Sequence, residues 1–142
     1  MNNMLIMKGR RVSPGKAEGT ALVTNQRIGF NFGVDTNSGI IVERGHELEG
    51  KSIKDVILVF PAGKGSTGGS FMIYQLARRG TGPKAMINEK TETIVAVGAV
   101  MGKIPVVDRL DKNPLEFIEN GDRVEVDADN GTVKVWKMNQ KP

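Results

Sequence analysis

Apolar and polar residues alternate near the C-terminal end of the chain. Over 122–137, DRVEVDADNGTVKVWK, two alternating runs flank the dipeptide Asn130-Gly131, which is typical of the two-residue turn in a β-hairpin. Every second side chain of a strand points to the same face, so the valines of the two runs can face one another. The pattern predicts a hairpin whose cross-strand neighbours are Val124, Val126, Val133 and Val135.

Short apolar runs and amphipathic segments alternate through the middle of the chain. The pattern predicts strands at 56–60, 85–88 and 104–107, and helices at 70–79 and 91–101. Gly80 is expected to end the first helix, and Ser70 to be its N-cap. Thr91 or Thr93 is expected to cap the second helix. A strand, a helix and a parallel strand in succession form a right-handed βαβ unit.

The N-terminal third predicts strands followed by a long loop. The segment 11–24 breaks at Pro14-Gly15, which indicates two strand pieces joined by a turn or bulge. The segment 30–50 is rich in Gly, Asn, Asp and Thr, with one apolar piece at 39–42. Long loops in compact domains tend to be functional or covered by a partner. The whole pattern predicts an α/β protein with mixed sheets, two helical segments and a C-terminal hairpin.

Composition narrows the class of protein. A length of 142 residues suits a single domain, expected over 1–142 with an ordered core of about 8–138 and a frayed tail from Met138. The net charge, 20 − 16 = +4, is dispersed and aromatic residues are few, which argues against nucleic acid as a partner. No apolar run is long enough for a membrane span or a signal peptide, so we expect a soluble cytoplasmic protein.

The chain has no cysteine and a single histidine, His46. It therefore forms no disulfide and offers no thiolate nucleophile, and it has no cysteine ligands for zinc or an iron–sulfur cluster. A metal site made of histidines is not expected either. His46 is expected to be a turn or hydrogen-bonding residue rather than a proton shuttle, because no partner carboxylate can be assigned to it from the sequence.

A loop of small residues joins the strand at 56–60 to the helix at 70–79. Glycine lets the backbone approach a ligand closely, and the first N–H groups of a helix have no partner within the helix. Such a loop is a site for negative charge. Its glycines are Gly63, Gly65, Gly68 and Gly69, and its reactive side chains are Lys64, Ser66, Thr67 and Ser70.

The sequence of this loop can be compared with two known nucleotide-binding motifs. A P-loop requires Lys followed directly by Ser or Thr, whereas Lys64 is followed by Gly65. The dinucleotide pattern G-x-G-x-x-G fits 63–68 between a strand and a helix, with Glu89 as a candidate ribose partner. The antiparallel pattern of both ends of the chain argues against the two βαβαβ halves that such a site normally has.

Several separated motifs resemble the small subunit of the aconitase X family. They occur in the family's order and cover 11–135: VSPGKAEGTALV, FGVDTNSGIIVERGHELEGKSI, ILVFPAGKGS, GKGSTGGSFMIYQLARRGTGPKAMI, ETIVAVGAVMGKIPVV and GDRVEVDADNGTVKV. The resemblance implies a swivelling β/β/α domain that closes over a larger catalytic subunit as a heterodimer. It implies that this chain binds no cofactor and that a 4Fe–4S cluster is held by cysteines of the large subunit.

The same resemblance implies a hydro-lyase and assigns the base to Ser66. It implies dehydration of a small phosphorylated hydroxy acid, (R)-5-phosphomevalonate, to trans-anhydromevalonate 5-phosphate in a variant mevalonate pathway. A serine is a poor base unless its alkoxide is stabilised, and the helix N-terminus and neighbouring N–H groups offer such stabilisation. The expected substrate and anion contacts are Gly63, Lys64, Gly65, Thr67 and Gly68.

Two alternatives remain open from the sequence. The chain could serve another aconitase-like hydro-lyase, such as a hydroxyproline dehydratase. It could also be a non-catalytic swivelling module that binds or carries phosphate. A phosphocarrier requires a nucleophilic histidine on a mobile loop, and His46 lies outside the glycine-rich loop.

Overall fold

The computed structural model describes residues 4–138, so all of the predicted tail at 138–142 except Met138 lies outside the described residues. The elements in chain order are β1 (Met4–Lys8), β2 (Arg10–Ser13), β3 (Lys16–Val23), α1 (Phe30–Gly33), β4 (Val34–Asp35), β5 (Ile40–Ile41), β6 (Ile57–Phe60), α2 (Gly68–Arg79), β7 (Ala85–Asn88), α3 (Thr93–Gly102), β8 (Val106–Asp108), α4 (Pro114–Phe117), β9 (Arg123–Asp127) and β10 (Thr132–Trp136).

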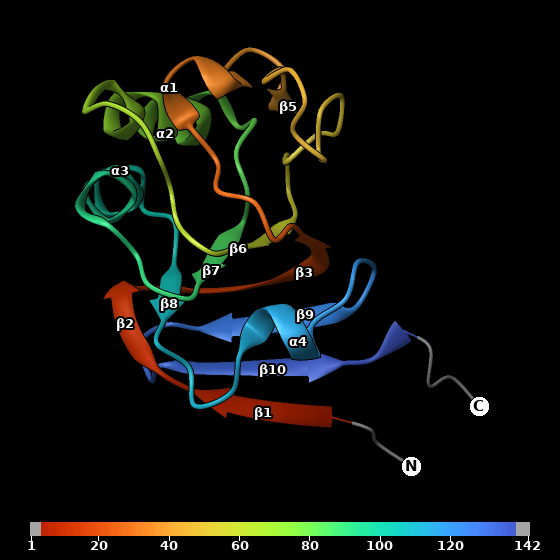
Figure 1. Cartoon of the computed structure of the whole chain (residues 1–142). Helices are drawn as coiled ribbons and strands as arrows, with labels where there is room; N and C mark the ends of the chain where they lie inside the picture. Colours follow the sequence, from red (N-terminus) through yellow and green to blue (C-terminus); the bar gives the residue numbers. More distant parts are fainter. Residues whose placement is uncertain (1–3, 139–142) are drawn as a thin grey trace.

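Eight strands are hydrogen-bonded in the order β1-β10-β9-β3-β6-β7-β8-β2. The pairs β3–β6, β6–β7 and β7–β8 are parallel, and the others are antiparallel. The first half of β3 pairs with β9 and its second half with β6, so this strand joins two β layers. Helices α1, α2 and α3 cover the outer face of the β6–β8 layer, and β1, β9 and β10 lie on its other side (Figure 1).

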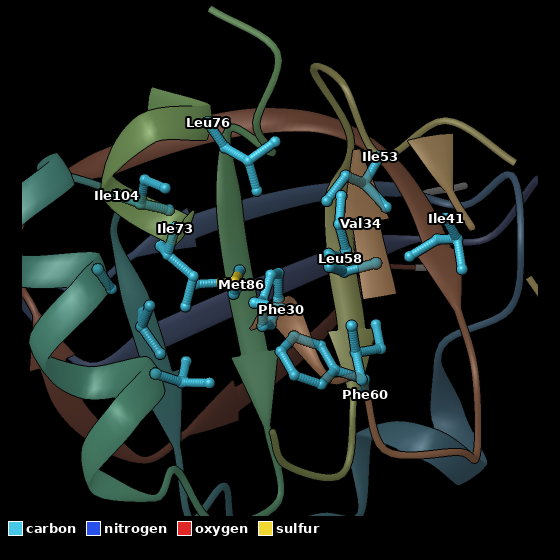
Figure 2. Packing of buried hydrophobic residues seen from close by; sticks show 14 of the residues in the cluster. Phe30, Val34, Ile41, Ile53, Leu58, Phe60, Ile73, Leu76, Met86 and Ile104 are labelled. Carbon is cyan, nitrogen blue, oxygen red and sulfur yellow. The ribbon is translucent and has the colours of Figure 1, made fainter. Parts of the chain in front are cut away.

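The two β layers and the helical layer enclose two hydrophobic cores. Leu58 and Phe60 of β6 point toward the helices, where the core shown in Figure 2 includes Phe30, Ile73 and Met86. Alternate residues of β6 and β7 point the other way and pack against β1, β9 and β10. Each central strand is therefore buried on both faces, which explains why it appears in the sequence as a continuous apolar run. The predicted β/β/α fold is confirmed.

The predicted C-terminal hairpin is confirmed in its register. Val126 pairs with Val133 and Val124 pairs with Val135 across β9 and β10. Strand β1, which the sequence pattern did not predict, adds to the other edge of β10. Its short run MLIMK contains Met7 as its one fully buried residue, so it carries too little alternation to identify a strand.

The βαβ unit β6-α2-β7 is confirmed, but both predicted N-caps are wrong. Helix α2 begins two residues before Ser70, whose hydroxyl donates to the Ile94 carbonyl at 2.6 Å and joins α2 to α3. The cap of α3 is Glu92, whose carboxylate accepts from two first-turn N–H groups. Gly80 ends α2 with φ 71°, as predicted. Glutamate is not among the preferred capping residues, so propensity pointed to the neighbouring threonines.

The segment 30–50 is irregular for most of its length, as its composition predicts. It contains the single turn α1 and the two-residue strands β4 and β5, which pair with one another. Asn31 and Phe32 have non-helical backbone angles inside α1, so this turn is not a regular helix. It packs against α2, and this contact brings the segment to the glycine-rich loop.

Candidate functional site

The glycine-rich loop leaves the carboxyl end of β6 and enters α2 (Figure 1). Its first part is fixed by Ile28, whose carbonyl accepts from the Lys64 N–H at 3.0 Å and whose N–H donates to the Ala62 carbonyl at 3.3 Å. Gly63 is buried in this contact, and a Cβ atom there would lie 2.6 Å from the Glu92 carboxylate and from Val95. Glycine is therefore required at position 63 by packing.

The second part of the loop exposes unpaired backbone donors. The N–H groups of Gly69 and Ser70 donate to the carbonyls of Ser66 and Thr67 at 3.0 and 3.3 Å. Within residues 4–138, the N–H groups from Gly65 to Gly68 have no acceptor. Gly65 has φ 104°, a conformation that favours glycine. Four successive donors at the start of a 12-residue helix favour an anion, so the anion site expected from the sequence stays a prediction for this loop.

Ser66 is exposed on this loop, and its Oγ accepts a hydrogen bond from the Asn31 side-chain amide. Asn31 lies against Gly68, where a Cβ atom would be 2.9 Å from the Asn31 amide. Gly68 therefore makes room for the side chain that reaches Ser66. The sequence analysis missed Asn31 because it lies 35 residues away in an irregular segment, with no local signal to connect it to the loop.

Lys64 points its ammonium to the Glu43 carboxylate at 2.7 Å. This ion pair is partly exposed, and it ties the loop to the segment that follows β5. The sequence analysis predicted no ion-pair partner for Lys64 and did not include Glu43 among the site residues. Thr67, the residue before α2, makes no capping bond with its side chain, and its exposed hydroxyl is available beside Ser66.

The carboxyl ends of β6, β7 and β8 are tied together by a polar network beside the loop. The Asn88 amide donates to the Phe60 carbonyl at 3.0 Å, and the Thr91 hydroxyl donates to the Asn88 side chain. The Thr91 N–H in turn donates to Asp108 at 2.7 Å, and Arg10 binds both carboxylate oxygens of Asp108 at 2.9 Å. This network fixes the three strand ends from which the loop and its neighbours emerge.

The Asp108 side chain is fully buried, whereas that of Arg10 is 53% exposed. Burial raises the pKa of Asp108, but the hydrogen bonds from Arg10 and Thr91 and the charge of Arg10 outweigh this effect and hold the pKa below its usual range. The carboxylate is therefore ionised at neutral pH.

A cavity of about 310 Å³ opens at the same strand ends, beside the buried Gly63. Its lining carries two cations and two carboxylates, and one of these carboxylates is the cap of α3. The lining residues are Arg27, Pro61, Ala62, Glu89, Lys90 and Glu92. Glu89, the candidate ribose partner, thus lies beside the loop. The three parallel strand pairs are flanked by antiparallel β2 and β9, as the argument against a dinucleotide site expects.

His46 is 6% exposed, and both nitrogens of its ring are engaged. The Leu48 N–H donates to Nδ1 at 3.0 Å, so Nε2 carries the proton and donates to the Arg27 carbonyl at 3.0 Å. The expectation that His46 is a hydrogen-bonding residue agrees with this arrangement. A buried ring with both nitrogens bonded is unsuited to accept phosphate, which disfavours the phosphocarrier alternative.

Neither a membrane span nor a metal cluster is found in the part of the chain that the structure describes. Over 4–138, no helix has the length and apolar character needed to cross a bilayer. The same residues include no group of three or more His, Asp or Glu side chains arranged to hold a metal ion.

The β/β/α fold and the serine-bearing loop at a strand–helix junction define a swivel domain of the aconitase type. The profile of the aconitase X swivel domain matches residues 6–135. The chain belongs to the aconitase X swivel domain family. It is 51% identical over 129 residues to the phosphomevalonate dehydratase small subunit of Methanocella arvoryzae, covering 91% of this chain and 98% of that protein.

A second relative and a solved structure support the same family assignment. The phosphomevalonate dehydratase small subunit of Thermococcus sibiricus is 48% identical, with 91% of this chain and 97% of that protein covered. The crystal structure of Thermococcus kodakaraensis aconitase X in its holo form matches with a TM-score of 0.88 and 43% identity, covering 94% of this chain and 99% of that chain.

Proposed function

We propose that this chain is the small subunit of a phosphomevalonate dehydratase, which converts (R)-5-phosphomevalonate to trans-anhydromevalonate 5-phosphate. The observation that carries the proposal is about 50% identity to relatives of this name over nearly the full length of both chains. The word "small" in these names implies a larger partner subunit, with which this chain forms a heterodimer.

In this proposal Ser66 is the base that removes a proton from the carbon next to the departing hydroxyl. An alkoxide at Ser66 Oγ would accept the hydrogen bond from Asn31 and would lie at the positive end of the α2 dipole. Neighbouring N–H groups from Gly65 to Gly68 have no acceptor among residues 4–138 and can add to this stabilisation. These features support a serine with more acidic character than an ordinary surface hydroxyl.

The iron–sulfur cluster belongs to the partner in this proposal. The chain has no cysteine, so its residues do not fit such a cluster. When bound on the large subunit, the cluster would supply Lewis acid chemistry at the departing hydroxyl. This chain would supply the base and part of the binding site for the anionic substrate.

Substrate contacts are proposed for the backbone and side chains around Ser66. Gly65, Thr67 and Gly68 offer N–H donors, and Thr67 adds a hydroxyl. Gly63 contributes by close packing beneath the loop, and Lys64 contributes a positive charge that Glu43 holds in place.

Titration with inorganic phosphate tests the loop as an anion site. We expect the amide signals of Gly65 to Gly68 to shift first, because helix N-termini and unpaired N–H groups attract anions. The Lys64 amide should respond less, since it donates to the Ile28 carbonyl. The measurement is an ¹⁵N NMR titration of the isolated chain. Earlier shifts in the hairpin β9–β10 would place the anion site elsewhere.

Reconstitution tests the proposed subunit role. The isolated chain is expected to fold but to give no turnover of phosphomevalonate, because it has no ligands for the cluster and supplies only part of the active site. Turnover should appear when the large subunit is added under anaerobic conditions. The assay follows trans-anhydromevalonate 5-phosphate, with hydroxyproline as the competing substrate. Activity of the isolated chain would refute the two-subunit assignment, and turnover of hydroxyproline alone would change the substrate.

A further inference from the structure

Phe32 combines high exposure with an unfavourable backbone conformation. Its side chain is 87% exposed, and its φ of 77° lies in the left-handed range that favours glycine. An aromatic side chain that stays exposed to water contributes little to the stability of the fold, and a positive φ at a non-glycine residue is energetically unfavourable. The folded chain alone therefore gives no reason for phenylalanine at this position. Strained and exposed aromatic residues of this kind are typical of binding surfaces.

A second exposed apolar side chain lies on the segment that pairs with the residues after Phe32. Val42 is 48% exposed, and its N–H donates to the carbonyl of Gly33 at 2.9 Å, which joins the two segments directly beside Phe32. We name the group of Asn31, Phe32, Gly33, Val42 and Glu43 the apolar tip. It lies on α1 and after β5, at the end of the molecule farthest from β1 (Figure 1).

Two side-chain contacts join the apolar tip to the glycine-rich loop. Asn31, the neighbour of Phe32, donates to Ser66 Oγ, and Glu43, the neighbour of Val42, binds the Lys64 ammonium at 2.7 Å. The polar members of the tip, Asn31 and Glu43, thus contact the loop, while the side chains of Phe32 and Val42 are exposed to solvent. A partner surface that binds Phe32 and Val42 would therefore also contact Ser66.

We propose that Phe32 and Val42 anchor this chain on the large subunit of the dehydratase and thereby set the position of Ser66 against the substrate. This inference depends on the proposed function. The large subunit is the fitting occupant because Ser66 must meet a substrate that the partner holds. A second copy of this chain on the same tip would cover Ser66 with a surface that contributes no complementary chemistry. Aromatic anchors dominate the binding energy of many interfaces.

The variant Phe32→Gly separates a role in association from a role in folding. Glycine adopts a positive φ without strain, so the melting temperature of the isolated chain should stay the same or rise. Association with the large subunit should weaken at least tenfold, and Val42→Ser should weaken it less. The control is Phe117→Ala, which removes a 40% exposed phenylalanine of α4, outside the tip. We expect it to lower the melting temperature and leave the dissociation constant unchanged.

The dissociation constant is measured by anaerobic biolayer interferometry with the large subunit immobilised, together with kcat and KM of the reconstituted enzyme. If the wild-type chain does not bind the large subunit, the proposed function itself fails. If the wild type binds and Phe32→Gly stays within threefold of it, the anchor is refuted and the function stands. A changed KM with an unchanged dissociation constant would assign Phe32 to the substrate and also refute the anchor. Loss of self-association as the only effect would assign the tip to a second copy.

Discussion

Replacement of Ser66 by alanine is expected to lower the kcat of the reconstituted dehydratase by about a hundredfold or more. A base acts in the transition state, so its loss lowers both kcat and kcat/KM. Folding should be nearly unaffected, because Ser66 is exposed and, among the side chains of residues 4–138, its Oγ is hydrogen-bonded only to Asn31. The measurements are steady-state kinetics, the melting temperature, and the dissociation constant for the large subunit.

Ser70→Ala is the matched control for this prediction. The Ser70 hydroxyl joins α2 to α3 through the Ile94 carbonyl, so its loss should cost about 1 kcal/mol of stability and little activity. If Ser70→Ala is inactive while Ser66→Ala is active, the base has been assigned to the wrong serine. If both variants remain active, the base comes from the large subunit and this chain has a structural or regulatory role.

Local patterns were sufficient to predict most elements of the fold. β6 and β7 are buried on both faces and therefore consist of continuous apolar residues. β9 and β10 are buried on one face and therefore alternate between apolar and polar residues. In both cases the burial of a strand can be predicted from its own residues. The glycine-rich loop was predicted for the same reason, since its composition, its position after a strand and its helix all lie within one continuous segment. The layer arrangement came from the family resemblance.

Most of the missed features depend on contacts between distant segments, whereas the Glu92 cap is a local contact that runs against residue propensity. β1 is a strand because β10 offers it an edge, and Glu92 caps α3 although threonines are better capping residues. Asn31 and Glu43 reach Ser66 and Lys64 from the irregular segment 30–50, whose composition indicates only a loop. The sequence therefore predicted the position of the glycine-rich loop between a strand and a helix. The side chains that bind Ser66 and Lys64, Asn31 and Glu43, were found only in the structure.

Asp108→Ala is expected to give the largest loss of stability, about 2–4 kcal/mol, or a melting temperature lower by about 5–15 °C. The fully buried carboxylate accepts three hydrogen bonds, two from Arg10 and one from the Thr91 N–H. Its loss leaves the Thr91 N–H without an acceptor and removes a link between β8 and the turn before α3. Arg10 is half exposed and can be hydrated instead, which limits the cost. Thermal unfolding of the isolated chain measures the effect.

Removal of an exposed pair provides the control. Glu18→Ala breaks the ion pair with Arg123, in which both side chains are about half exposed, and should change the melting temperature much less. If Asp108→Ala and Glu18→Ala had equal effects, the polar network at the strand ends would not be important for stability.

The pH dependence of unfolding gives an independent test of Asp108. Its pKa is lowered in the folded protein, so its contribution is complete above the pKa of the unfolded chain, about 3.9, and is lost as the pH falls through the lower pKa of the folded protein. Wild-type stability should therefore fall below about pH 5 more steeply than that of Asp108→Asn. Asp122, whose pKa is lowered by Lys137 and neighbouring N–H groups despite its burial, should retain part of the slope in this variant. Identical acid profiles for the two proteins would show that Asp108 has an ordinary pKa in the folded chain.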